Sequence, residues 1–195
     1  SAIAFAIALG IVSVSRLFAP IFWGEDFAPC AYILSALALS IPFSGFANVI
    51  RMQYLIPNGM DGAYILSVIL GAVSNLTANS LLIPRCGALG AAVGTVIAEG
   101  VVCAAQCLAV KKRIDILAYL KSTAFFGMAG LLMYGAVRVL DQRAEITVSW
   151  LLLEIVVGGS VYCILSVLYL YHTKNELLMT ALQKLGGAHQ NNDRG

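Results

Sequence analysis

Long apolar runs separated by short polar segments form the dominant pattern of this sequence. Six of these runs have at least 22 residues, and each contains at most one charged residue. A helix needs about 20 apolar residues to cross about 30 Å of hydrocarbon. The pattern therefore predicts an all-α, polytopic membrane protein with six transmembrane helices. The predicted spans are residues 1–23, 27–50, 62–84, 86–110, 116–137 and 146–171.

The pattern changes after the last apolar run. The residues TKNE at 173–176 have the form of a capping box, and leucines then follow at helical spacing. Residues 172–187 are therefore predicted to form a cytoplasmic amphipathic helix on the membrane surface. Residues 188–195 are polar and are predicted to form a disordered tail.

Composition excludes the soluble classes of protein. Hydrophobic residues make up 60% of the chain and charged residues 11%, and the mean hydropathy is +0.88. A soluble domain has about 25% charged residues, so this surface is expected to contact membrane lipid. The net charge is only +2, and the bases do not cluster with aromatic residues. No nucleic-acid partner is predicted.

The residues that most often carry catalysis or bind metals are sparse. The five cysteines are scattered through apolar sequence, and the two histidines, His172 and His189, lie near the C-terminus. A His-based catalytic triad or a His-ligated metal site inside the apolar runs is therefore not expected. We predict no catalytic residue, no metal and no resident cofactor. Because the chain begins with Ser1 and enters an apolar run at once, we expect it to be a piece of a longer protein.

The distribution of lysine and arginine predicts an orientation in the membrane. Six spans with short loops must alternate sides, which divides the bases eight to four. The eight are Arg51, Lys111, Lys112, Arg113, Lys121, Lys174, Lys184 and Arg194; the four are Arg16, Arg85, Arg138 and Arg143. By the positive-inside rule the larger group, and with it the C-terminus, lies in the cytoplasm of a multi-pass cell-membrane protein.

The fourth run carries two stripes at helical spacing. Gly90, Gly94 and Ala98 form a small-residue stripe, which favours close packing of one membrane helix on another. The second stripe contains Thr95, Glu99 and Gln106 and is too polar to face lipid. An acid at the centre of a membrane helix costs about 2.5 to 3.5 kcal/mol, so Glu99 either faces a cavity or hydrogen-bonds between two helices.

Four further polar residues allow two readings each. Asn75 and Asn79 are one turn apart in the third run, where they either join helices through amide hydrogen bonds or line a hydrated cavity. Arg51 ends the second run and precedes a rather apolar loop, so it either sets the topology or borders a cavity. Arg16 lies near the outer end of the first run and either snorkels outward or contacts a ligand.

Three segments together resemble a known family of transporters. They are RMQYLIPNG at 51–59, NLTANSLLIP at 75–84 and GALGAAVGTVIAE at 87–99. In order and spacing they resemble the C-terminal half of bacterial polysaccharide-biosynthesis exporters. These are the lipid-linked oligosaccharide flippases of the multidrug/oligosaccharidyl-lipid/polysaccharide exporter superfamily.

The resemblance implies one lobe of a two-lobe, alternating-access transporter, whose partner would be the N-terminal lobe of the same chain. The substrate would be a polyprenyl-diphosphate-linked oligosaccharide, with Arg51 and Arg16 attracting the diphosphate and Glu99 coupling transport to an H⁺ or Na⁺ gradient. Four residues would hydrogen-bond sugar hydroxyls: Asn75, Asn79, Thr95 and Gln106. The alternatives are a cation-coupled multidrug or toxin exporter of the same superfamily and a non-transporting membrane scaffold subunit.

Overall fold

The computed structural model describes residues 2–142 and 146–172, and every regular element in those ranges is helical. Five of the described helical segments are long and apolar enough to cross a membrane. The all-α prediction is confirmed. The prediction counts six spans where the structure has five such segments, because two of the predicted runs are joined in one element. The predicted amphipathic helix and tail fall largely outside the described residues.

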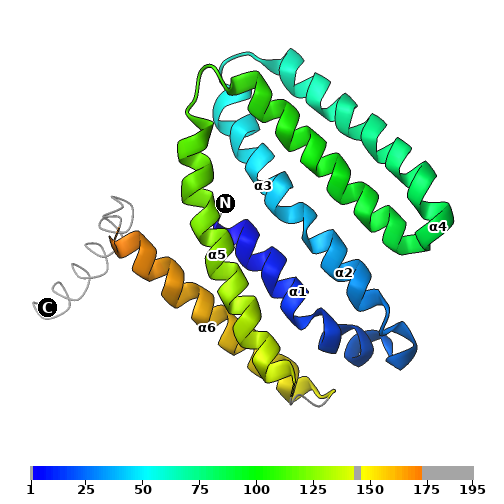
Figure 1. Ribbon diagram of the computed structural model, residues 1–195. Coiled ribbons are helices and arrows are strands. Elements are labelled where there is room, and N and C mark those ends of the chain that lie inside the picture. The colour runs from blue at the N-terminus through cyan, green and yellow to red at the C-terminus, as the bar shows by residue number, and fades with distance from the viewer. Residues whose placement is uncertain (1, 143–145, 173–195) are drawn as a thin grey trace, which may run out of the picture.

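The first half of the chain contains two antiparallel rods. Helix α1 (Ala2–Trp23) leads through a short 3₁₀ turn, η1 (Glu25–Phe27), into α2 (Cys30–Ala38) and α3 (Ser40–Ile50). The break between α2 and α3 has a local cause, because Pro42 has no N–H to donate to the carbonyl of Ala38. Leu39 instead donates to the carbonyl of Ala36 at 3.1 Å, which tightens the turn. The two helices therefore form one bent rod (Figure 1).

The second rod continues beyond the predicted end of its apolar run. A π-helical turn, η2 (Arg51–Leu55), extends α3, and the N–H of Ile56 donates to the carbonyl of Arg51 at 3.0 Å. The expected loop after Arg51 is therefore helical over its first part. Leu55 is fully buried in an apolar cluster with Phe46 and Val110, and this burial favours continued helix.

Helix α4 (Asp61–Val110) is a hairpin of two helical halves. Gly87 has φ +56°, a conformation that a glycine adopts without the penalty a side chain brings, and the chain reverses there (Figure 1). Residues of the two halves face each other in antiparallel register. The facing pairs are Ser67 with Gln106, Gly71 with Val102, Asn79 with Gly94 and Leu82 with Gly90.

Small residues let the two halves of α4 approach closely. A Cβ atom on Gly90 would overlap the backbone of Leu82, and one on Gly94 would overlap the side-chain oxygen of Asn79. The carbonyl oxygen of Ala98 would lie 3.5 Å from a Cβ on Gly71. Gly90, Gly94 and Ala98 thus all lie at this interface, where glycine permits backbone contact that larger residues prevent.

Helix α1 lies at the centre of the other helices. It contacts α2, α3, α5 (Ile116–Asp141) and α6 (Val148–His172), so it joins the α2–α4 part to the α5–α6 pair (Figure 1). Ala129, Met133 and Tyr162 form the buried cluster between α5 and α6. The hydroxyl of Tyr162 also donates to the carbonyl of Ala2 at 2.7 Å, which fixes the start of α1 against α6.

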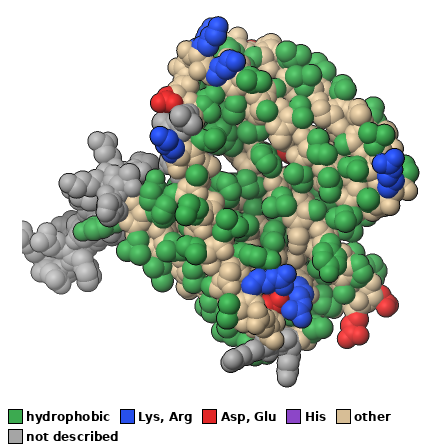
Figure 2. Space-filling view, in the orientation of Figure 1, with side chains coloured by type: hydrophobic (Ala, Val, Ile, Leu, Met, Phe, Trp, Pro, Cys, Tyr) green, Lys and Arg blue, Asp and Glu red, His purple; other side chains and the backbone are tan. Residues whose placement is uncertain are grey.

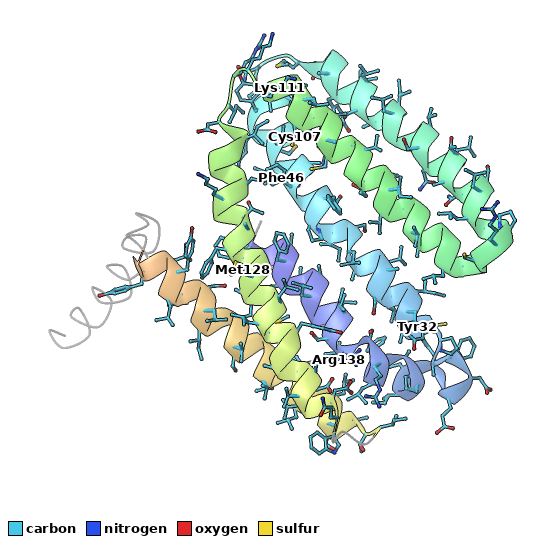
Figure 3. All side chains as sticks on the ribbon, in the orientation of Figure 1. Tyr32, Phe46, Cys107, Lys111, Met128 and Arg138 are labelled. Carbon is cyan, nitrogen blue, oxygen red and sulfur yellow. The ribbon has the colours of Figure 1, made fainter. Side chains whose placement is uncertain are left out.

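The surface of the described residues is largely apolar. Ile65, Leu132 and Ile164 are typical of many large aliphatic side chains that remain exposed. Figure 2 shows hydrophobic side chains over most of the visible face, with charged side chains in small separate groups. Figure 3 places Lys111 and Arg138 at opposite ends of the molecule. Such an apolar belt between charged ends is the arrangement expected of helices that cross a bilayer.

The close contact in the α4 hairpin predicts that Gly90→Ala destabilises the protein. The new methyl group would have to displace backbone, which costs about 1 to 3 kcal/mol in a packed core. Gly100→Ala is the matched control, because it lies in the same helix with no atom within 4 Å of the new Cβ. Thermal unfolding of the purified protein in detergent should show a lower Tm for Gly90→Ala than for Gly100→Ala. Equal melting temperatures would contradict this account of the hairpin.

Candidate functional site

Two adjoining cavities meet at Glu99, and we call them together the Glu99 groove. The first, of about 440 Å³, lies between α3 and the second half of α4. The second, of about 400 Å³, lies between the two halves of α4. Glu99 lines both cavities, so a single carboxylate borders two spaces. Of the predicted site residues, the groove brings together Arg51, Asn75, Asn79, Thr95 and Glu99.

One wall of the groove is a polar stripe on α3. Ser40, Ser44, Asn48 and Arg51 follow one another at intervals of three or four residues, and all four line the first cavity. This spacing puts them on the same face of a helix. The first three were not among the site residues predicted from the sequence. Their periodicity within an otherwise apolar run was the signal that could have revealed them.

Arg51 has no acidic partner among the described residues. Its Nη2 atom donates to the Oδ1 atom of Asn48 at 2.5 Å, and its guanidinium carbon lies 5.3 Å from the ring centroid of Tyr64. These contacts orient the side chain without neutralising it. No carboxylate oxygen of the described chain lies within 4.0 Å of its nitrogens. The positive charge is therefore available to an anion in the cavity.

Glu99 is half-buried and, within residues 2–142 and 146–172, makes no hydrogen bond or ion pair. It borders the same cavity as Arg51, yet the two side chains are not paired. A guanidinium and a carboxylate that face one cavity without touching leave room for a third group between them. The interpretation of Glu99 as a clamp between two helices has no contact to support it in the described part of the chain.

The amide and hydroxyl groups of the second cavity are partly engaged. The Nδ2 atom of Asn79 donates to the Oδ1 atom of Asn75 at 2.9 Å, and the hydroxyl of Thr95 donates to the carbonyl of Ala91 at 3.1 Å. The amide nitrogen of Asn75 has no acceptor among the described residues. The two asparagines therefore bond to each other and still present a free donor to the cavity.

Gln106 lies outside the groove. Its side chain is 1% exposed, and its Nε2 atom donates to the hydroxyl of Ser67 at 3.1 Å across the α4 hairpin. Helical spacing relative to Thr95 and Glu99 suggested a shared polar face, but two turns beyond Glu99 the facing partner is the other half of α4. In the structure Gln106 joins two helices and does not border either cavity.

Arg16 is also separate from the groove. Its Nη1 atom forms a salt bridge of 2.8 Å with the Oδ2 atom of Asp141, and the same oxygen accepts a bond of 2.9 Å from Arg138. Arg16 lies toward the C-terminal end of α1 and Arg51 directly follows the C-terminal end of α3, and because these two rods are antiparallel the arginines lie toward opposite ends of the molecule. The two arginines predicted to attract one diphosphate are thus not brought together. Arg16 and Asp141 are 125 residues apart in the sequence, so no local sequence pattern predicts their pairing.

The described residues contain no group of three or more His, Cys, Asp or Glu side chains that could hold a metal ion. Comparisons with protein-family models, curated proteins and solved structures gave no match. The chemistry of the site is therefore inferred from the groove itself. It offers one guanidinium and one carboxylate without charged partners, together with amide and hydroxyl groups, inside an apolar helical body.

Proposed function

We propose that the chain is the C-terminal lobe of an alternating-access membrane transporter that moves polyprenyl-diphosphate-linked oligosaccharide units across the cell membrane. The observation that carries the proposal is the Glu99 groove, where Arg51 and Glu99 face one polar cavity without pairing. A charged saccharide cannot cross hydrocarbon unaided because desolvation of its polar groups is too costly. A groove with a cation and hydrogen-bonding groups would replace the lost water.

The membrane arrangement we propose has six crossings. Each half of α4 exceeds the about 20 residues that a crossing requires, so each half is assigned its own span. Among the described residues five bases then lie on one side and three on the other. The five are Arg51, Lys111, Lys112, Arg113 and Lys121; the three are Arg16, Arg85 and Arg138. The positive-inside rule favours a cytoplasmic location for the Arg51 end.

The groove would recognise the head group and leave the lipid tail in the bilayer. Arg51 can donate two parallel hydrogen bonds to phosphate oxygens, a geometry that lysine does not reproduce. Ser44, Asn48 and the free amide of Asn75 would bond to sugar hydroxyls. The exposed apolar side chains of the helices would meet the polyprenyl chain, which needs no polar contact.

Glu99 would couple transport to an H⁺ or Na⁺ gradient. An ionised Glu99 attracts Arg51 across the shared cavity, whereas a protonated or Na⁺-bound Glu99 does not. The bound cation would therefore neutralise a charge that competes with the diphosphate for Arg51. Substrate capture would then depend on whether the carboxylate of Glu99 carries a cation, and coupled transport requires such a dependence.

A second candidate function, the export of organic cations, is favoured by the unpaired carboxylate of Glu99. In such an exporter Arg51 would repel the substrate rather than bind it. The two functions therefore predict opposite effects of removing the arginine.

Arg51→Ala should reduce export of polymer by at least tenfold at unchanged membrane abundance. Charge-assisted hydrogen bonds contribute about 1.5 to 3 kcal/mol, and one such bond accounts for roughly tenfold in affinity. Arg113→Ala is the matched control, because it removes the same charge at the same end from an exposed position outside the groove. Export by the full-length protein should be near normal for Arg113→Ala and intermediate for Arg51→Lys. Wild-type export by Arg51→Ala would leave Arg51 as a topology determinant, and faster export of organic cations would support the second candidate.

Glu99→Gln should abolish the dependence of turnover on the ion gradient while leaving abundance unchanged. The substitution preserves the size and polarity of the side chain, replaces one acceptor oxygen by an NH₂ donor and removes the negative charge. Glu25→Gln, in the exposed turn η1, is the control for loss of an acid elsewhere. Transport would be measured in proteoliposomes with and without imposed pH and Na⁺ gradients. Gradient-driven turnover equal to that of the wild type would contradict a coupling role.

A further inference from the structure

A third cavity, of about 690 Å³, lies among α1, α2 and α5 at the end of the molecule opposite Lys111. Arg16 and Arg138 line it, together with Tyr32 and Tyr134. Figure 3 shows Tyr32 and Arg138 on different helices at this end. Its volume is within the range of about 300 to 1,000 Å³ that small-molecule sites occupy. We call it the two-arginine pocket.

A buried carboxylate holds the two arginines in place. Asp141 is almost fully buried, and its Oδ2 atom accepts hydrogen bonds from the Nη1 atoms of both Arg16 and Arg138. The arginine side chains are 58% and 52% exposed, so their remaining nitrogens are accessible. An arginine has five N–H donors in a rigid planar group. One anchored carboxylate therefore positions two guanidinium groups at the rim and leaves most of their donors free.

The charged side chains that line the pocket are all positive. Two arginines and no acidic side chain line it, and Asp141 behind them supplies one negative charge. Glu154, the other buried acid at this end, lines a separate and almost wholly apolar cavity among α1, α5 and α6. Within the described residues Glu154 forms no ion pair with either arginine, although both arginines act on its carboxylate electrostatically. Arg138 lies on the same helix as Asp141, so only Arg16 is needed to tie α1 to α5 through this carboxylate.

Tyrosine and serine side chains make up the other polar lining of the pocket. Tyr32 is 73% exposed and offers a flat ring with a hydroxyl that has no partner among the described residues. Tyr134 accepts a hydrogen bond of 2.9 Å from the Nε atom of Arg138, which fixes its ring at the cavity wall. Ser13 and Ser35 each donate to a helix carbonyl, and the hydroxyl of Ser35 also shares a hydrogen bond of 2.9 Å with the hydroxyl of Ser15. Rings and hydroxyls beside cations suit a polar molecule with both a ring face and a negative group.

We propose that the two-arginine pocket binds an oxyanion carried by a saccharide, either a sugar carboxylate or a sugar phosphate, at the end of the lobe opposite the Glu99 groove. The oxyanion part of this assignment comes from the pocket alone, and the saccharide part rests on the proposed function. In a transporter with the proposed orientation this site faces the exterior. It would receive the anionic head group as the groove releases it.

Binding of soluble probes to the purified full-length protein tests the assignment without requiring transport. Isothermal titration calorimetry would compare glucose 1-phosphate, glucuronate, inorganic phosphate and glucose. We expect the two sugar oxyanions to bind at least tenfold more tightly than glucose. Arg16→Ala and Arg138→Ala should each weaken that binding by about tenfold, the loss of one charge-assisted contact. Comparison of the affinities for glucose 1-phosphate and glucuronate identifies which oxyanion the pocket prefers.

Three further variants separate a specific effect on binding from a general effect on charge or folding. Arg85→Ala removes an exposed arginine at the same end of the helices but outside the pocket, and it should leave binding within twofold of the wild type. Arg138→Lys preserves the charge and should lose less affinity than Arg138→Ala. Tyr32→Ala changes only an exposed rim residue, so the fold is retained, and it should weaken glucose 1-phosphate without weakening inorganic phosphate.

Two results would overturn the oxyanion site: equal affinity for glucose and glucose 1-phosphate, or an equal loss in Arg85→Ala and Arg16→Ala. Equal sensitivity of inorganic phosphate and glucose 1-phosphate to Tyr32→Ala would overturn its saccharide part. Failure of this inference is distinct from failure of the proposed function. If the sugar oxyanions do not bind to the two-arginine pocket but export still depends on Arg51, only the inference about this pocket is rejected. If Arg51→Ala exports normally and the two-arginine pocket still binds oxyanions, only the proposed role of the Glu99 groove is rejected.

Discussion

The close approach of the two halves of α4 is the contact on which the candidate site depends. Glycine at positions 71, 90 and 94 lets each half lie against backbone or side-chain atoms of the other, and Gly87 permits the reversal between them. This packing sets Asn75 opposite the stripe that carries Glu99. If the halves were held further apart by larger residues, the second cavity would lose the arrangement of its walls.

Because the exterior is apolar, the hydrogen bonds of the interior polar side chains indicate which of them have a structural role. A polar group away from water is costly unless it is hydrogen-bonded, so most of these groups have partners. Gln106 bonds to Ser67, and Asp141 bonds to two arginines. Arg51 and Glu99 have no charged partner in the described chain although they border one cavity. The contrast separates polar residues that hold helices together from those that are available to a ligand or an ion.

Sequence patterns predicted the helices because run length and spacing are local properties. The small-residue stripe at Gly90 and the polar residue Glu99 could be identified in the same way. The spacing of the serines in α3 is also a local pattern and carries the same kind of signal. The role of Gln106 depends on which helix faces it, and that is decided by the reversal at Gly87. The joining of Arg16 to Asp141 depends on the packing of α1 against α5, which no local pattern encodes.

The proposed transport roles of the two sites require that the Lys111–Arg113 turn and the Arg85–Gly87 turn lie on opposite sides of the membrane. Labelling with a membrane-impermeant maleimide in intact cells tests this most directly. Cys86 is exposed at the α4 reversal, and Lys112 is exposed in the turn after α4. A variant whose only cysteine is Cys86 should be labelled, whereas a cysteine-free variant carrying Lys112→Cys should be labelled only after permeabilisation. Labelling of the Lys112→Cys variant in intact cells, with Cys86 protected, would contradict the account.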